Sequence, residues 1–173
     1  MKRWIPEYTA TPLAVGPLEQ HPAKAFYMAE FLDLEAEKPS PKALAGILAN
    51  LHQSSVSPTG KFGFPVTTFK GYVPMNNAWT DSWEEWFTRQ FRMDVEQCIG
   101  GPDGEIDDEL LEQFCTKVIP RLLRPLQTGG RTIKPSLCHT DIWHGNVHLD
   151  KLAKVPIIFD ACCVYGHHES EIN

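Results

Sequence analysis

Residues 137–169 read LCHTDIWHGNVHLDKLAKVPIIFDACCVYGHHE, and this stretch decides the predicted fold. The run from Val155 to Phe159 is strongly apolar, which is typical of a buried strand. A shorter apolar run, Val147 to Leu149, precedes it, and the residues between the two form a polar turn. The pattern predicts a β-hairpin that doubles the chain back on itself.

Three side chains with oxygen donors flank this hairpin. Asp141 and Asn146 precede its first strand, and Asp160 follows its second. The hairpin therefore predicts that Asp160 returns to the loop that holds the other two. Carboxylate and amide oxygens suit Mg²⁺, and a carboxylate can instead accept a proton from a reacting hydroxyl. Spacing alone also leaves open a plainer interpretation, in which these side chains satisfy the backbone donors of a turn.

The same stretch resembles the catalytic and metal-binding loops of kinase-like phosphotransferases. The resemblance is strongest to the fructosamine kinase (ketosamine 3-kinase) family, itself similar to aminoglycoside phosphotransferases. That family carries His-Gly-Asp-Leu-Trp-x-Gly-Asn, a hairpin, an apolar run that ends in Asp, and Tyr-Gly-His-x-Glu. The matching positions are His139, Asp141, Trp143, Gly145, Asn146, Asp160, Tyr165, Gly166, His167 and Glu169. One position departs, because Thr140 stands where the family has glycine.

The resemblance implies an ATP- and Mg²⁺-dependent kinase acting on the sugar 3-hydroxyl of ketosamines, as protein-ribulosamine and fructosamine 3-kinases do in deglycation repair. Asp141 would be the catalytic base, and His139 would orient its loop. Asn146 and Asp160 would hold Mg²⁺ on the phosphates. The expected partners are a glycated protein or a small ketosamine.

Further positions are assigned only by the resemblance. The backbone around Glu30 and Phe31 would meet the adenine of ATP. The substrate-binding positions that it implies are Trp79, Trp143, Tyr165, His167 and Glu169.

The expected fold is α+β and protein-kinase-like. Residues 1–35 would be a remnant of the small lobe and the hinge, and residues 36–173 a helical large lobe that is incomplete at its carboxyl end. The sequence has no Gly-x-Gly-x-x-Gly loop, and neither Lys2 nor Lys24 can take the position of the phosphate-binding strand lysine. A second hypothesis follows, namely a catalytically inactive fragment or pseudokinase that binds a partner or nothing.

Periodicity predicts the remaining elements. A strand is weakly indicated around Leu13 to Val15, and a buried strand at residues 25–32. An amphipathic helix is expected at residues 41–53, starting at Ser40-Pro41. A second helix, at residues 82–98, would open with a capping box at 81–84 and close at Gly100-Gly101. A third would start at Asp107-Asp108, with Leu110, Leu111, Phe114 and Val118 facing inward.

Composition excludes several classes of protein. The net charge is −6 and no basic run occurs, which argues against nucleic acid or an anionic membrane as the main partner. Five cysteines without framework spacing fit a reducing compartment. No apolar run has the length of a membrane span, and no apolar signal segment follows Met1. A cytoplasmic location is therefore expected.

Two other chemistries are compatible with parts of the sequence. His144 with His148, and Cys163 with His167, have spacings seen at zinc sites, but no Cys-x-x-Cys is present. Cys138 beside His139 is a weaker candidate for a nucleophile and base, because sequence neighbours rarely bring the two groups within reach.

Overall fold

The computed structural model describes residues 1–35, 37–99 and 106–171. The chain divides into two compact units, and each is discontinuous in sequence. The first unit comprises Met1–Ser54 and Asp141–Ala161, and the second comprises Ser55–Thr140 and Cys162–Asn173. The two units are described separately below. These units are defined by contacts within the chain. The boundary between a small and a large lobe, expected at residue 35, stays a prediction.

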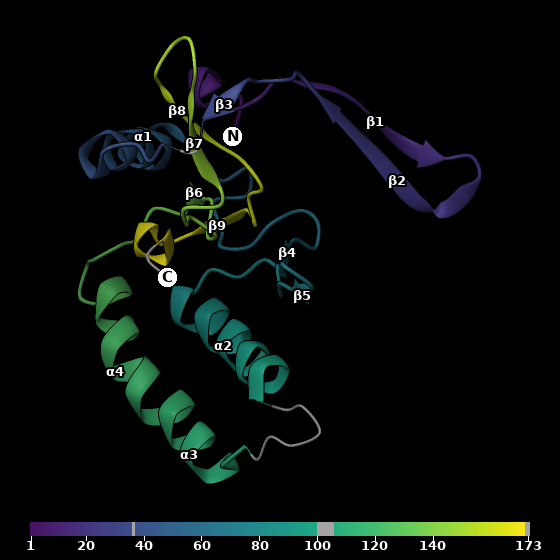
Figure 1. The fold of residues 1–173 in the computed structure, drawn as a ribbon. Coiled ribbons are helices and arrows are strands. Elements are labelled where there is room, and N and C mark those ends of the chain that lie inside the picture. Colours follow the sequence, from purple (N-terminus) through teal and green to yellow (C-terminus); the bar gives the residue numbers. More distant parts are fainter. Residues whose placement is uncertain (36, 100–105, 172–173) are drawn as a thin grey trace. The chain divides into compact units, whose positions relative to one another are not determined.

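The first unit contains two small antiparallel sheets and one long helix (Figure 1). One sheet pairs β1 with β2, and the other has the strand order β3-β7-β8. The elements are the 3₁₀ turn Pro6–Tyr8, β1 (Pro12–Leu18), β2 (His21–Ala29), β3 (Leu34–Glu35), α1 (Pro41–Ser54), β7 (Val147–Asp150) and β8 (Pro156–Ile158).

The helix α1 confirms the predicted amphipathic helix. Ser40 precedes it, and its hydroxyl oxygen accepts a hydrogen bond from the N–H of Ala43 at 3.2 Å, so Ser40 satisfies one of the unpaired amides of the first turn. Pro41 takes the first helical position, where its missing N–H costs nothing. Ile47 and Leu51, which are four residues apart and share a face, are buried.

The strand predicted at residues 25–32 is only partly correct. The strand β2 forms, but it ends at Ala29, and its residues are exposed except at that end. The prediction of burial was wrong because β2 pairs only with β1. A two-stranded ribbon has no second layer to cover either face.

The predicted hairpin of the organising stretch is confirmed as β7 and β8. Val147 pairs with Ile158, and Leu149 pairs with Pro156. All residues of β8 are buried, as expected for an apolar run that forms a central part of the core. Beyond this ladder the N–H of Phe159 donates to the carbonyl of Asn146 at 3.1 Å, so the pairing continues up to the residues of interest.

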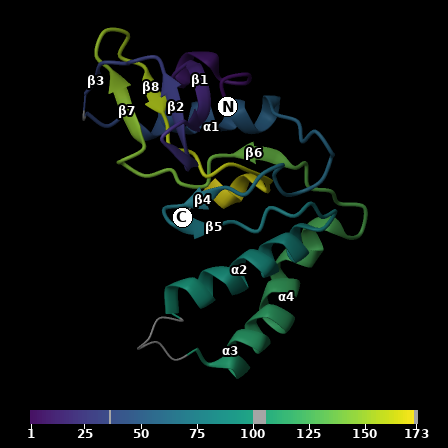
Figure 2. The ribbon, with the colours of Figure 1, turned by 90° about the vertical axis from the view of Figure 1, so that its right-hand side faces the viewer.

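The second unit contains short strand pairs and a helical pair. The strands pair as β4-β5 and as β6-β9, both antiparallel. The elements are β4 (Phe69–Lys70), β5 (Val73–Pro74), α2 (Trp83–Ile99), α3 (Asp108–Gln113), a π-helical turn (Phe114–Val118), α4 (Ile119–Leu123), a 3₁₀ turn (Arg124–Gln127), β6 (Ser136–Cys138), β9 (Val164–Gly166) and a 3₁₀ turn (His168–Glu171). Figure 2 shows α2 beside the α3–α4 segment.

The helix α2 carries the aromatic core of this unit. The rings of Trp83 and Trp86 stack with centroids 5.1 Å apart, and both residues are 3% exposed. The helix was predicted correctly, but the cap lies one residue later than expected, because Ser82 Oγ accepts the N–H of Glu85 at 3.2 Å. The predicted end at Gly100-Gly101 lies outside the described residues.

The third helix begins as predicted and then departs from regular geometry. Asp107 caps α3 by accepting the N–H of Leu110 at 2.8 Å. Pro120 lacks an N–H, and just before it the N–H of Ile119 bonds to Phe114 five residues back, which makes a π-helical turn. The extra residue in this turn breaks the 3.6-residue spacing on which the inward face was predicted. Val118 is accordingly exposed and Ile119 is buried in its place. Leu110, which precedes the turn, is exposed as well, so the predicted inward face was wrong at both residues.

Among the helices of the described part of the chain, none has the length and apolarity needed to cross a membrane.

Candidate active site

The hairpin brings the predicted oxygen donors of the first unit together at Asn146. The side-chain nitrogen of Asn146 donates to Asp141 Oδ2 at 2.9 Å and to the Asp141 carbonyl at 2.9 Å. The same nitrogen lies 3.5 Å from the carbonyl of Asp160. Asn146 is only 4% exposed, so these contacts are held within the folded chain. The three residues therefore lie close together, with Asp160 reached at its backbone carbonyl, and the convergence of their side-chain oxygens on a metal stays a prediction.

A tight turn fixes this arrangement. The N–H of Asn146 donates to the carbonyl of Trp143 at 3.0 Å. The Trp143 ring lies against Gly145, where an added Cβ would come within 2.4 Å of it. Gly145 is thus required for the close approach of ring and backbone. Trp143 itself is half exposed, and its ring makes an edge contact with His144 at 4.6 Å.

The donor set fits a small divalent cation. Asn146 uses its amide nitrogen on Asp141, so its amide oxygen is the atom that could face a cation. The Asp160 side chain is exposed, and its backbone is left-handed, with φ of 56°. Asp tolerates this conformation better than most residues, and such a strained position is often found at functional sites. Carboxylate and amide oxygens together with water match the preference of Mg²⁺.

His139 and Thr140 belong to the second unit, at the end of β6. His139 is fully buried, and its N–H donates to Glu171 Oε1 at 2.7 Å. Thr140 is left-handed, with φ of 60°, and its N–H donates to Glu171 Oε2 at 2.8 Å. The Thr140 hydroxyl donates to the carbonyl of Cys162. Glu171 was not predicted, because its two partners lie 32 and 31 residues away and no local spacing marks the contact.

The Cys138 thiol is unsuited to nucleophilic catalysis. Burial, and secondarily the negative charge of Glu171, raise the pKa of Cys138 to about 12. Its sulfur points to the carbonyl of Ser136 at 3.3 Å, as a weak donor does. A thiol must ionise to attack, so the alternative of a Cys138–His139 pair is disfavoured.

Two of the predicted substrate residues form an aromatic group in the second unit. The rings of Trp79 and Tyr165 lie 6.2 Å apart, and Phe64 stacks on Tyr165 at 5.9 Å. Backbone bonds hold this group, because Gly63 and Tyr165 exchange N–H···O bonds at 2.9 and 3.0 Å. Gly63 has φ of 131° and lies too close to the Asn77 carbonyl for a side chain to fit.

Two others, His167 and Glu169, line a separate hollow of about 240 Å³ in the same unit. Aromatic rings from α2, among them Trp86 and Phe87, form its apolar part. The N–H of Glu169 donates to His167 Nδ1 at 3.2 Å, which indicates a neutral ring. Burial, together with the neighbouring His168, lowers the pKa of His167. The approach of Glu169 Oε2 to Nδ1 at 3.7 Å is therefore no ion pair in the neutral state.

The predicted adenine-binding residues follow β2 in the first unit. The N–H of Glu30 donates to the carbonyl of Thr11, and the N–H of Thr11 donates to the Glu30 carboxylate, both at 2.9 Å. Hydrogen bonding of the Glu30 carboxylate with the Thr11 side chain, and then with the Thr11 N–H, lowers the pKa of Glu30. The Phe31 side chain is 90% exposed.

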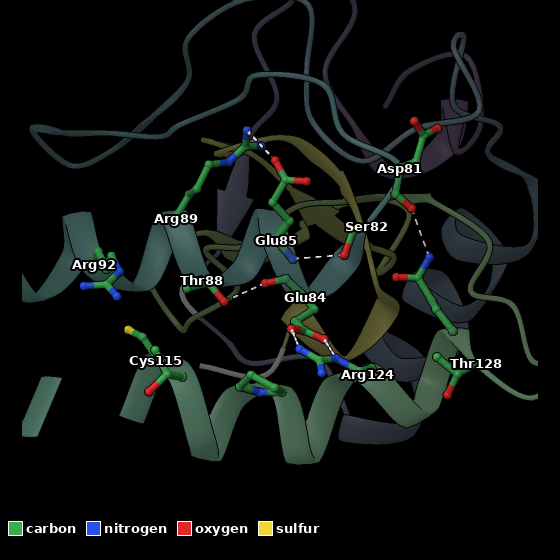
Figure 3. A pocket seen from close by; sticks show the side chains of 13 residues that line it. Asp81, Ser82, Glu84, Glu85, Thr88, Arg89, Arg92, Cys115, Arg124 and Thr128 are labelled. Carbon is green, nitrogen blue, oxygen red and sulfur yellow. Dashed lines mark hydrogen bonds and ion pairs between the residues drawn. The ribbon is translucent and has the colours of Figure 1, made fainter. Parts of the chain in front are cut away.

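Another hollow on the second unit lies between α2 and α4 (Figure 3). Its volume is about 770 Å³, and none of the predicted site residues lines it. Its arginines are already paired: Arg124 bonds to Glu84 at 2.7 and 2.9 Å, and Arg89 approaches Glu85 at 3.3 Å. Because these arginines are paired with glutamates, their positive charges are compensated and do not favour the binding of an anion.

Comparison with known proteins gives a consistent result. The model of the family described as fructosamine kinase matches residues 8–173. Protein-ribulosamine 3-kinase, chloroplastic, of Oryza sativa subsp. japonica is 31% identical over 167 residues, which cover 92% of this chain and 44% of the relative. Ketosamine-3-kinase of Mus musculus is 39% identical over 112 residues, 65% of this chain and 34% of the relative. The chain thus spans under half the length of these relatives.

Solved structures show the same fold. A putative fructosamine-3-kinase from Haemophilus somnus superposes with a TM-score of 0.66 at 20% identity, over 95% of this chain and 52% of that one. A putative fructosamine-3-kinase from Thermobifida fusca gives 0.59 at 24% identity, over 84% and 47%. The mixed α+β architecture is therefore shared with these structures.

Proposed function

The chain belongs to the fructosamine kinase family, and from that premise we propose that it carries the catalytic and metal-binding part of an ATP-dependent ketosamine 3-kinase. The observation that supports this most is the Asn146 side chain, which bonds to Asp141 and reaches the carbonyl of Asp160. If the side chains of this loop only accepted hydrogen bonds from the backbone of their own turn, a buried amide that contacts residues before and after the hairpin would not be needed.

Asp141 is the proposed base. Its carboxylate is held by the Asn146 amide at 2.9 Å, and a base with a fixed direction can accept the proton of a sugar hydroxyl as that oxygen attacks the γ-phosphate of ATP. The attacking oxygen forms a bond to phosphorus, and the bond from phosphorus to the bridging oxygen of ADP breaks. A positioned base of this kind contributes roughly 10²- to 10⁴-fold to the rate.

Asn146 and Asp160 are the proposed magnesium ligands. Both offer oxygen atoms of the type that Mg²⁺ prefers. Bound there, Mg²⁺ would neutralise the charge of the ATP phosphates. The exposed side chain of Asp160 leaves room for phosphate oxygens and water beside it.

The proposed ketosamine-binding residues offer aromatic surface and a carboxylate. Sugar rings and alkyl chains pack on faces such as those of Trp79 and Tyr165. The Glu169 carboxylate is complementary to the protonated amine of a ketosamine. Trp143 is a third aromatic candidate. It is half exposed and lies two residues after Asp141 in the sequence. We propose that the backbone of Phe31 binds the adenine of ATP. The N–H of Glu30 already donates a hydrogen bond to the Thr11 carbonyl.

The first experiment compares phosphate transfer by the full chain and its Asp141→Asn variant. Labelled ATP, Mg²⁺ and fructosyl-lysine are supplied, and the phosphorylated sugar is measured. Asn matches the shape of Asp but cannot accept the proton, so we expect a loss of at least about 100-fold. Asp108→Asn makes the same chemical change at an exposed position of α3 and should leave transfer unchanged.

The sequence itself favours one competing function. It lacks a glycine-rich phosphate loop and the strand lysine of kinases, as expected for a pseudokinase or an inactive fragment. Absence of transfer from both parent and variant would support that reading. Equal transfer by parent and variant would refute the base role of Asp141.

A further inference from the structure

Two ion pairs join the segment after β2 to the turn between β7 and β8, and all four residues belong to the first unit. Lys151 Nζ lies 2.5 Å from Asp33 Oδ1, and Lys154 Nζ lies 2.5 Å from Glu35 Oε1. The N–H of Lys151 also donates to the carbonyl of Asp33 at 3.0 Å. The side-chain hydrogen bond to Glu35 raises the pKa of Lys154. The turn therefore binds the acidic segment through two charged side chains and one backbone bond.

The strand pairing that accompanies these ion pairs is short. The strand β3 pairs Leu34 with Asp150 and Glu35 with Leu149. In an antiparallel ladder only every second residue pair exchanges hydrogen bonds, so a ladder of this length supplies few of them. The side-chain contacts therefore contribute a large share of what holds β3 against β7.

The turn presents the two lysines in fixed directions. Asp150 Oδ1 accepts the N–H groups of Leu152 and Ala153 at 3.0 and 2.7 Å, and the Asp150 carbonyl accepts the N–H of Lys154 at 2.9 Å. Lys154 has a left-handed backbone, with φ of 56°, which glycine adopts with less strain. A strained residue of this kind persists where the surroundings hold it, and here the lysine side chain makes a contact that glycine could not supply.

These contacts lie between the two places where ATP is proposed to bind in the first unit. Phe31 precedes Asp33 by two residues, and Asn146 directly precedes β7. A strand rises about 3.3 Å per residue, so the backbone from Asp150 back to Asn146 spans about 13 Å. This is the order of distance between the base of a nucleotide and its terminal phosphate. The attachment of β3 to β7 therefore sets the separation of the proposed adenine contact from the proposed magnesium ligands.

We propose that Lys151 and Lys154 are positioning residues for ATP. They hold the segment after β2 against the hairpin, so that Phe31 and Asn146 can contact one nucleotide at the same time. The proposal rests on the proposed function, in which ATP binds at these two places. Each lysine acts through its acidic partner and touches no nucleotide. Contacts that are fixed in advance lower the cost of ordering on binding, so the effect falls on the affinity for ATP and not on the chemical step.

The first test replaces both lysines by methionine in the full chain. Methionine has an unbranched side chain like that of lysine but carries no charge. Both lysine side chains are about half exposed, so the change opens no cavity. Lys61→Met is the matched control, because it removes an exposed ion pair to Asp81, of 2.8 Å, in the second unit.

Three quantities are measured on the parent and on each variant. Amide hydrogen exchange at position 151 reports the bond to the Asp33 carbonyl and needs no activity. We expect its protection to fall roughly threefold or more, because exposed ion pairs each contribute modestly, while Phe159, whose N–H donates to the Asn146 carbonyl, keeps its protection. Isothermal titration calorimetry gives the Kd for ATP with Mg²⁺, and the transfer assay gives kcat and the KM for ATP.

The affinity for ATP should change and the chemical step should not. We expect the Kd and the KM for ATP to rise roughly 3- to 10-fold in the double methionine variant, with kcat within about twofold of the parent. The control should leave all of these quantities unchanged. A fall in kcat with an unchanged KM for ATP would contradict a role in seating the nucleotide.

A charge exchange tests the pairing itself and does not depend on the methionine variant folding. Lys154→Glu and Glu35→Lys each place like charges opposite one another, so each should raise the Kd for ATP. The chain that carries both changes has opposite charges again and should return to within about twofold of the parent. A combined variant that binds ATP as weakly as the single variants would refute the proposal.

The remaining outcomes also decide the proposal. Unchanged protection at position 151 would overturn the claim that the lysines hold the segment. Reduced protection with unchanged Kd and KM for ATP would show a structural contact and overturn the positioning role. A parent chain that binds ATP but transfers no phosphate would refute the proposed phosphotransferase, and the change in Kd would then decide the role of the lysines. A parent chain that does not bind ATP would overturn both proposals.

Discussion

At the scale of single residues, two positions near the proposed site combine a side chain with left-handed backbone. Thr140 has φ of 60° and Asp160 has φ of 56°. Glycine is the residue with least strain in this conformation, and the family motif has glycine at the position of Thr140. The Thr140 hydroxyl offsets part of the strain by its bond to Cys162.

A pair of substitutions separates strain from hydrogen bonding at Thr140. Thr140→Ala loses the hydroxyl bond but keeps a Cβ, so we expect it to lower the free energy of unfolding by about 1–2 kcal/mol. Thr140→Gly loses the same bond but relieves a backbone strain of about 1–2 kcal/mol, so it should be close to the parent. Denaturant titration measures both. A glycine variant no more stable than the alanine variant would contradict the strain argument.

The charge of His167 makes the stability of the protein depend on pH. Burial and His168 lower its pKa below the usual 6.5 in the folded protein. The unfolded chain therefore binds the proton first as pH falls, so His167 contributes stability above about pH 6.5 that is lost below it. We expect a midpoint below 6.5 in an NMR titration of the His167 ring. His167→Gln should reduce the fall in melting temperature between about pH 7.5 and 5.5, and a midpoint at or above 6.5 would contradict the assignment.

The sequence predicts part of the geometry of the candidate site but not all of it. Asp141, Asn146 and Asp160 were predictable because an apolar strand and a polar turn force the chain back beside itself. Glu171 was not, because its contact depends on where a turn after β9 lies relative to the end of β6. Long-range placements of this kind are not set by local periodicity.

At the scale of elements, apolar periodicity predicted which segments form helices. It did not predict the capping residue of α2 or the π-helical turn. The helices α1 and α2 formed as predicted, since both carry strong apolar faces. The cap of α2 shifted from Asp81 to Ser82, because either residue type can cap and only geometry selects between them. Periodicity similarly gives no signal for the π-helical turn, in which the Ile119 N–H bonds to the Phe114 carbonyl and the apolar face moves from Val118 to Ile119.

Substitution of Ser82 tests which residue caps α2. Ser82→Ala removes the oxygen that accepts the Glu85 N–H, so we expect a loss of about 1 kcal/mol in the free energy of unfolding. Ser82→Gly should cost only a few tenths of a kcal/mol, because glycine is well tolerated at this position. Equal values for the two variants, measured by denaturant titration, would argue against Ser82 as the cap.

At the scale of the whole molecule, the units are discontinuous because distant strands pair. The strand β3 pairs with β7, so residues 34–35 are joined to residues 149–150 within the first unit. From the sequence alone we expected a domain boundary between consecutive segments. Pairing between strands more than a hundred residues apart leaves no local signal in the sequence. Periodicity therefore predicted the two strands of the β7–β8 hairpin. It could not predict that β3 pairs with β7.

Apolar exposure is unevenly distributed over the described residues. Several large side chains of the β1–β2 hairpin are exposed, namely Leu13, Val15, Leu18, Phe26, Tyr27 and Met28. A two-stranded ribbon is marginal alone, and contiguous apolar surface on a soluble protein promotes association. The β1–β2 hairpin is therefore a defined surface at which association of the chain can be tested.

Val15 and Tyr27 face each other across the two strands and are 75% and 66% exposed. We expect Val15→Thr with Tyr27→Thr to weaken concentration-dependent association in sedimentation velocity, since threonine keeps strand propensity but lowers apolar area. The melting temperature should stay unchanged, because neither side chain is packed. Leu152→Thr is the control: Leu152 is 94% exposed but lies in the β7–β8 turn, so it should not alter association. A parent chain that stays monomeric at all concentrations, or a control as effective as the double variant, would refute association through the hairpin.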